Sequence, residues 1–150
     1  MIGITEATIN NLEELSILFD LYRQFYRQPS NIENARRFLN ERIINKESVI
    51  FISTEEDGAI SGFVQLYPIF TSVGLKRCWL LNDLFVKKDY RKKGIARKLL
   101  DKCKKHAEET NASGILLETS KNNLEGNVLY PTEGFILQDE SNFYFWKSSF

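Results

Sequence analysis

The stretch from Leu84 to Leu100, LFVKKDYRKKGIARKLL, decides the fold of this 150-residue chain. An apolar, strand-like run ends at Val86, a short charged loop follows, and Arg91–Ala96 (RKKGIA) opens an amphipathic helix. Backbone N–H groups at a helix N-terminus lack partners within the helix, and the helix dipole favours an anion there. The stretch therefore predicts a strand–turn–helix junction that holds phosphate groups.

Positive charge is concentrated at this junction. The whole chain is neutral, with 20 Lys+Arg and 20 Asp+Glu, but ten basic residues between Lys87 and Lys105 face only two acidic ones, a balance of 10 − 2 = +8. Such a concentration indicates an anionic ligand. For the basic residues from Arg97 onward, we favour the alternative that they form the solvated face of a surface helix. For Arg91–Ala96 we favour a role in binding the anionic ligand, because glycine is a poor residue at a helix start unless the backbone turns or approaches a ligand closely.

Length and composition predict a single domain over residues 1–150, with 43% apolar and 27% charged residues. No apolar run approaches the roughly 20 residues that cross a bilayer, and the N-terminus has no basic stretch followed by an apolar one. We therefore expect a cytoplasmic protein. Cys78 and Cys103 are interpreted as small buried hydrophobes in a reducing compartment, and with His106 as the single histidine no metal site is expected.

Hydrophobic periodicity predicts an α/β (α+β) domain of three layers, in which a central mixed sheet is covered by helices on both faces. The expected order is βααβββαβαββ. The expected strands cover about 2–7, 48–54, 59–67, 78–86, 115–119, 135–137 and 143–146, and the expected helices about 8–27, 31–44, 95–110 and 123–130. Pro68 and Pro131 are expected to end the third strand and the last helix.

Two motifs in this order resemble those of the GCN5-related N-acetyltransferase superfamily. Arg91–Ala96 matches the acetyl-CoA signature R/Q-x-x-G-x-G/A, placed after a strand and before a helix. The second stretch, LLETSKNNLEGNVLYPTEGF, is similar to the family pattern L-E-x-x-x-x-N-x-x-A-x-x-L-Y-x-x-x-G-F, with Gly126 in place of the usual alanine. The segments LYRQFY and FVQLYPIF look like the branch that contains fungal histone and polyamine acetyltransferases and bacterial relatives.

The resemblance implies transfer of an acetyl group from acetyl-CoA to an amine. The amides of the Arg91–Ala96 turn would hold the pyrophosphate, and the pantetheine arm would pair with the backbone near Phe85 and Val86. The Val86 N–H could also stabilise the oxyanion of the tetrahedral intermediate. The cofactor-binding residues implied in this way are Leu84, Phe85, Val86, Arg91, Lys92, Lys93, Gly94, Ile95, Ala96, Arg97, Asn123 and Tyr130.

Acetyl transfer needs one group that removes a proton from the incoming ammonium and one that protonates the leaving thiolate. By its motif position Tyr130 is the expected acid, although Pro131 should bias it away from helical dihedrals. Glu118, at the motif position where some family members place a base, and Asp83, in the strand before the phosphate turn, are both candidates for the base. A carboxylate among apolar neighbours would have a raised pKa, which suits this role. A water chain without one assigned base stays open.

The resemblance implies a small-molecule or peptide amine as the acceptor, and the sequence does not choose among them. In the family that the chain resembles, the acceptor pocket is usually built from the first two helices and the loop between the third and fourth strands. The candidate residues there are Tyr22, Tyr26, Tyr67, Phe70 and Asp83. Aromatic rings can hold a cation by their faces, and they can equally be plain core.

Two alternatives compete with a transferase. The basic stripe of residues 87–105 could bind nucleic acid, although the chain has no recognisable reading motif. A non-catalytic acetyl-CoA sensor would keep the fold and the cofactor without turnover. As partners we expect the amine, with a homodimer left open, and neither nucleic acid nor a membrane.

Overall fold

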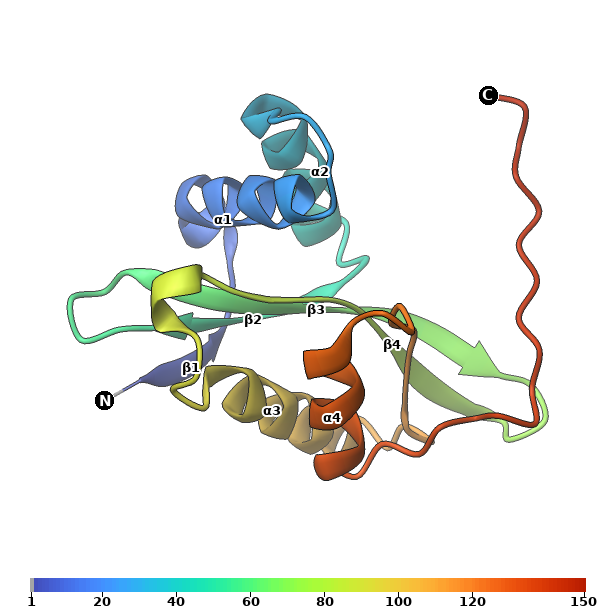
Figure 1. Cartoon of the computed structure of the whole chain (residues 1–150). Coiled ribbons are helices and arrows are strands. Elements are labelled where there is room, and N and C mark those ends of the chain that lie inside the picture. The colour runs from blue at the N-terminus through green and yellow to red at the C-terminus, as the bar shows by residue number, and fades with distance from the viewer. Residues whose placement is uncertain (1) are drawn as a thin grey trace. The chain divides into compact units, whose positions relative to one another are not determined.

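A computed structural model describes residues 2–150, and the chain divides into two compact units, one up to Glu118 and one from Thr119 to Phe150. The first unit contains β1 (Gly3–Glu6), η1 (Ile9–Asn11), α1 (Leu12–Phe25), α2 (Ile32–Ile44), β2 (Val49–Thr54), β3 (Ile60–Thr71), β4 (Lys76–Val86), η2 (Lys88–Tyr90), α3 (Ile95–Glu109) and β5 (Ile115–Leu117). The second unit contains α4 (Leu124–Thr132). Figure 1 labels the main elements.

One five-stranded sheet organises the first unit, in the order β1-β2-β3-β4-β5. The first four strands pair antiparallel, and β5 joins β4 in parallel. Helices α1 and α2 lie on one face of the sheet and α3 on the other (Figure 1). The expected α/β class, with a mixed sheet between helical layers, is confirmed.

Side chains along β2 point alternately to the two faces of the sheet, and each face has its own buried core. Ile50 and Ile52 face the cluster formed with Leu15, Leu18 and other residues of α1 and α2. Phe51 points to the opposite face, where its ring lies 5.4 Å from that of His106 on α3. Successive side chains of a strand point to opposite sides, so a β-branched and aromatic run that is apolar throughout is buried on both faces.

Both prolines that were expected to end an element lie inside one. Pro68 pairs with Trp79 within β3, which continues to Thr71. The strand tolerates it because β2 pairs only with residues 60–66 of β3, so the missing N–H faces an edge without a strand partner. Pro131 lies in the last turn of α4, and the Glu133 N–H still donates to the Leu129 carbonyl at 3.0 Å. The expected helix end at Tyr130 was wrong by two residues.

The two strands expected at 135–137 and 143–146 are not formed. Residues 135–150 contain no helix or strand, and the side chains of Phe143, Tyr144, Phe145 and Trp146 are exposed. A strand needs a neighbour that satisfies its backbone groups, and α4, the one regular element of this unit among the described residues, offers no strand edge. The sequence pattern identified β-prone segments but not their pairing.

Among the described residues, none of the helices has both the length and the apolar character needed to cross a membrane.

Candidate active site

The turn between β4 and α3 leaves the first amides of α3 uncapped. Gly94 occupies the N-cap position in the left-handed region (φ 77°), and Lys92, two residues earlier, also has a positive φ of 61°. A glycine offers no side chain to the helix end, so the N–H groups of the first turn point outward. A Cβ added at Gly94 would meet no atom within 4 Å, so the space over the turn is open. This geometry suits an anion.

The edge of β4 next to this turn has no strand partner on one side. Pairing with β5 is confined to Trp79–Leu81, so the two strands diverge beyond that point. A bulge at Asn82 separates the two registers, because Gln65 pairs with Asp83 while Leu66 pairs with Leu81. The backbone from Asn82 to Val86 is therefore unpaired within the first unit on its β5 side.

The register of β4 tells which amides face that edge. The Lys87 N–H donates to the Ser61 carbonyl of β3 at 2.8 Å, and every second residue of an antiparallel strand points the same way. The backbone groups of Phe85 therefore face β3, and those of Leu84 and Val86 face the unpaired edge. An extended chain such as the pantetheine arm could pair there.

Arg91 folds back onto the end of β4. Its Nε donates to the Val86 carbonyl at 2.9 Å, and its guanidinium lies over the rings of Phe25 and Phe85, with its central carbon 5.6 and 5.5 Å from their centroids. The side chain thus ties the turn to α1 and β4, which leaves the phosphate contact to backbone amides and to the neighbouring lysines.

A cavity of about 410 Å³ lies on the α1/α2 face of the sheet. It is lined by Phe19, Tyr22, Arg23, Asn34, Ala35, Phe38 and Asp83. Three of these seven residues are aromatic, Asp83 is the acidic group of the lining and Arg23 is its basic group. Such a lining suits a small amine, whose charge the carboxylate can pair and whose carbon chain the rings can cover.

Asp83 is held by three hydrogen bonds inside this wall. Gln65 Nε2 donates to Oδ2 at 2.7 Å, Asn82 Nδ2 donates to Oδ1 at 3.1 Å, and the Tyr22 side chain also hydrogen-bonds the carboxyl. Burial raises the pKa of Asp83 and outweighs these three bonds, which lower it. Gln65, which sequence reasoning missed, is fully buried, and its Oε1 has no hydrogen-bond partner.

The other predicted acceptor residues are only partly brought together. Burial, followed by the charge of Asp83, raises the pKa of Tyr67 to about 12. Tyr26 is exposed, and its ring lies 5.1 Å from that of Tyr22. Phe70 lies opposite Arg77, five residues along β3 from Gln65 and thus roughly 17 Å away, so the structure does not bring it to the cavity.

The two candidate bases differ in environment. Glu118 directly follows β5, is exposed, and adjoins the last paired position of β4 and β5. Asp83 is buried in the aromatic wall. The environment that raises a carboxyl pKa, which the sequence analysis expected for a base, is therefore found at Asp83.

The second unit presents the remaining motif residues. Asn123 caps α4 by accepting from the Gly126 N–H at 3.1 Å, and its Nδ2 donates to Thr119 Oγ1 at 2.9 Å. A Cβ at position 126 would contact the Asn123 amide too closely, so an alanine there would require this side chain to shift. Tyr130 lies in the last turn of α4, with its ring 5.8 Å from that of Phe135.

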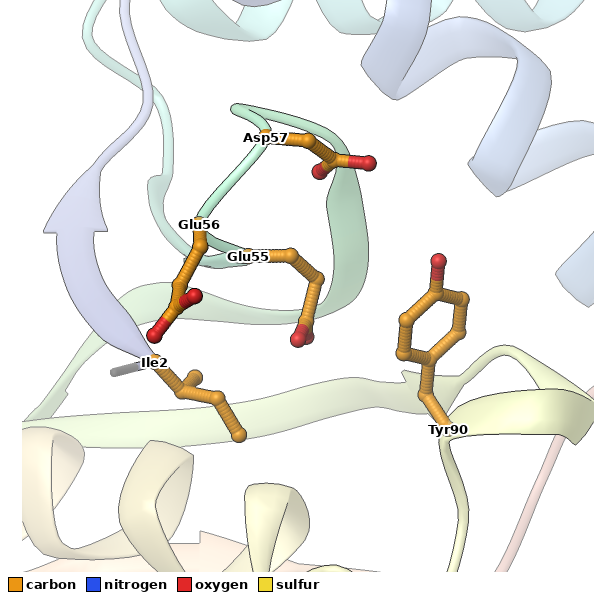
Figure 2. A pocket seen from close by; sticks show the side chains of 5 residues that line it. All are labelled: Ile2, Glu55, Glu56, Asp57 and Tyr90. Atoms are coloured by element: carbon orange, nitrogen blue, oxygen red, sulfur yellow. The ribbon is translucent and has the colours of Figure 1, made fainter.

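A second hollow, of about 400 Å³, is lined by acid. Figure 2 shows Glu55, Glu56 and Asp57 of the β2–β3 hairpin with Tyr90 and Ile2. Negative side chains disfavour a diphosphate, so this hollow does not suit the cofactor. No group of three or more His, Cys, Asp or Glu residues in the described part of the chain could hold a metal ion.

Comparison with known proteins identifies the family. The model of the acetyltransferase (GNAT) family matches residues 15–135. The chain belongs to the GNAT family. The uncharacterized N-acetyltransferase YhfO of Bacillus subtilis is 41% identical over 133 residues, 89% of each chain, and a probable acetyltransferase of Haemophilus influenzae is 33% identical over 89% of this chain and 90% of its own length. The crystal structure of a probable acetyltransferase superposes with a TM-score of 0.94 at 38% identity and covers 98% of both chains.

Membership confirms four expectations. This GNAT protein is an acetyl-CoA-dependent N-acetyltransferase, with the predicted superfamily, fold class, enzyme class and co-substrate. The likeness to the branch with fungal histone and polyamine acetyltransferases stays a prediction, as do the roles of individual residues.

Proposed function

We propose that this GNAT protein acetylates a primary amine of a small molecule or peptide, by direct attack on acetyl-CoA in a ternary complex. The observation that carries the proposal is the position of Asp83 and Val86 on one strand. The two residues are three positions apart, so their backbones are separated by roughly 10 Å. Asp83 lines the cavity, and the Val86 amide lies at the unpaired edge of β4. Residues 1–150 would act as one N-acetyltransferase domain.

The cofactor would lie along β4 and end at the α3 turn. Amides of Gly94, Ile95 and Ala96 would bind the diphosphate, with Lys92, Lys93 and Arg97 screening the remaining phosphate charge. Leu84 and Val86 would pair with the pantetheine arm. The Val86 N–H would then point at the acetyl carbonyl oxygen, where it can stabilise the oxyanion.

Asp83 would receive the amine and accept its proton. The ammonium loses a proton to the carboxylate, and the free nitrogen attacks the acetyl carbon. The nitrogen then releases its second proton to solvent, and the carbonyl re-forms as the C–S bond breaks and the thiolate departs. The raised pKa of Asp83 supports this role, because a base whose pKa lies nearer neutrality accepts a proton more readily. Glu118 is the alternative base, and it is exposed.

By its motif position, Tyr130 would protonate the departing thiolate, and Asn123 would contact the cofactor. Tyr130 lies in the last turn of α4 and is half-buried. Tyr22 and Tyr26 would contact the acceptor, and Tyr67 would lie beside Asp83. The reaction would take place in the cytoplasm, where the free thiols of Cys78 and Cys103 stay reduced.

A screen of amines tests the proposal. Polyamines, aminoglycosides, amino acids and peptides are each mixed with acetyl-CoA, and release of free thiol is followed. We expect amine-dependent release by the wild type, a large loss of turnover in Tyr130→Phe, and nearly unchanged acetyl-CoA affinity in that variant. Acetyl-CoA binding without thiol release for any amine would favour a non-catalytic sensor instead.

A further inference from the structure

The cavity on the α1/α2 face carries one charged residue of each sign. Its lining includes Asp83 on β4 and Arg23 on α1. Asp83 can pair with a protonated amine, but a guanidinium in the same cavity repels one. A cavity that held only an amine would therefore be better without Arg23. The presence of both charges indicates a substrate that has an anionic group as well as an amine.

The hydrogen-bond donors of Arg23 are available to such a group. The residue is half-buried, and its guanidinium has no hydrogen-bond or ion-pair partner among the described residues. Its charge helps to lower the pKa of Asp20, but that carboxylate already accepts hydrogen bonds from Gln24, Ser30 and the Asn31 amide. Arginine presents five N–H donors in a planar fork that fits a carboxylate. A ligand carboxylate in the cavity would satisfy these donors.

The two charges are separated by an aromatic stretch of the lining. No cation contributes to the pKa of Asp83, Arg23 included, which is the result expected when several ångströms separate the two groups. Phe19, Tyr22 and Phe38 also line the cavity, and the rings of Phe19 and Phe38 are stacked with their centroids 5.8 Å apart. These rings would cover a carbon chain that joins an amine at one end of the cavity to an acid at the other.

The volume of the cavity limits the size of this substrate. Its 410 Å³ would hold roughly 14 non-hydrogen atoms, if each takes about the 30 Å³ that a water molecule occupies in the liquid. An amino acid with a short carbon chain between its charged groups is of this size. An aminoglycoside is larger, and a polyamine would place a second cation beside Arg23.

We propose that the acceptor is an amino acid whose primary amine binds at Asp83 and whose carboxylate, several bonds away, binds at Arg23. Asn34, the third residue of α2, lines the same cavity, and its amide can donate a further hydrogen bond to that carboxylate. This inference rests on the proposed function, because it names the acceptor of the same reaction. Arg23 selects the acceptor and takes no part in proton transfer.

Three primary amines with the same number of carbon atoms test the proposal. They are δ-aminovalerate, pentylamine and cadaverine, which end in a carboxylate, a methyl group and a second ammonium, and thiol release from acetyl-CoA gives kcat/KM for each. The wild type should prefer δ-aminovalerate roughly ten- to a hundredfold, the effect of one hydrogen bond to a charged group. Equal values, or a preference for another amine, would overturn this inference alone. No thiol release with any amine would overturn the proposed function as well.

Two substitutions at Arg23 test the assignment of the residue. Arg23→Gln should raise the KM for δ-aminovalerate roughly ten- to a hundredfold, with a much smaller effect on pentylamine, which has no acid group. Arg23→Glu should invert the preference, so that cadaverine becomes a better acceptor than δ-aminovalerate, a result that partial unfolding cannot produce. The matched control is Arg37→Gln, because Arg37 is an exposed arginine of α2 outside the cavity lining. The same KM for δ-aminovalerate in Arg23→Gln and in Arg37→Gln would contradict the proposal.

Discussion

Two buried carboxylates of the first unit, Asp20 and Asp83, have nearly equal exposure, 2% and 5%, and three hydrogen-bond donors each. Their pKa values nevertheless move in opposite directions. For Asp20, burial raises the pKa, but hydrogen bonds from the Asn31 amide, Ser30 and Gln24 and the charge of Arg23 outweigh it and leave the pKa lowered. For Asp83, burial prevails and the pKa is raised.

The difference lies first in depth, because Asp83 is much farther from solvent than Asp20 and burial therefore raises its pKa more, and then in the donors and the neighbouring charge. Asp20 accepts a peptide N–H at 2.7 Å and has Arg23 nearby, so its ionised form is stabilised where it joins α1 to the start of α2. The Asp83 donors are all side chains, two of them neutral amides, and no cation contributes to its pKa. One site is therefore built to stay charged and hold two helices together, and the other to exchange a proton.

Replacing Asp83 should give the largest effect. Asp83→Asn keeps the shape of the side chain but removes the base, so turnover should fall by about 10²–10⁴, the usual contribution of general base catalysis. Steady-state thiol release measures this, with Asp20→Asn as the matched control at a temperature where both variants are folded. Comparable losses in the two variants would show that the assignment of roles is wrong, and a normal rate in Asp83→Asn would favour Glu118.

Asp20→Asn should act on stability instead. The new amide places an NH₂ group opposite the donors Ser30 and Gln24, and it removes a buried charge that accepts three hydrogen bonds. We expect the free energy of unfolding to fall by about 1–3 kcal/mol. Urea denaturation measures it, and an unchanged midpoint would mean that the junction of α1 and α2 is held by other contacts.

Tyr22→Phe should shift the pH dependence of the reaction. The Tyr22 hydrogen bond lowers the pKa of Asp83, so its loss should raise that pKa further and move the acid limb of kcat/KM to higher pH. At neutral pH the rate should fall several-fold, because a hydrogen bond to a charged group is worth about 1.5–3 kcal/mol. Tyr26→Phe, whose contact with Tyr22 is between rings, should leave the limb in place. Equal shifts of the acid limb in Tyr22→Phe and Tyr26→Phe would contradict the role of the Tyr22 hydrogen bond to Asp83.

The smallest effect concerns stability against pH. Because the folded pKa of Asp83 is raised, its ionisation costs stability. The free energy of unfolding of the wild type, relative to that of Asp83→Asn, should therefore fall as pH rises above 3.8 through the raised pKa. The folded pKa of Asp20 is lowered. The free energy of unfolding of the wild type, relative to that of Asp20→Asn, should therefore increase with rising pH and decrease as pH falls below 3.8. Denaturation midpoints from pH 3 to 8 (roughly the range that includes both transitions) test the opposite slopes.

The sequence allowed most of the first unit to be predicted, because its signals are local. Periodicity identified α1, α2 and α3, and Gly94 marked the turn where the backbone takes a positive φ. What depends on pairing was missed. Gln65 meets Asp83 only through the β3–β4 register and the bulge at Asn82, and Pro68 is tolerated only because β2 is too short to reach it. The strand expected at 143–146 lacks a partner within its own unit.

Calorimetry with acetyl-CoA tests the central claim, that amides at the α3 turn hold the cofactor while Asp83 acts on the amine. Gly94→Trp should abolish binding, and Gly58→Trp is the matched control, since Gly58 also has a positive φ (87°) and open space around it. Asp83→Asn should bind acetyl-CoA as the wild type does. If Gly94→Trp bound acetyl-CoA with wild-type affinity, the cofactor would lie elsewhere and the account would be contradicted.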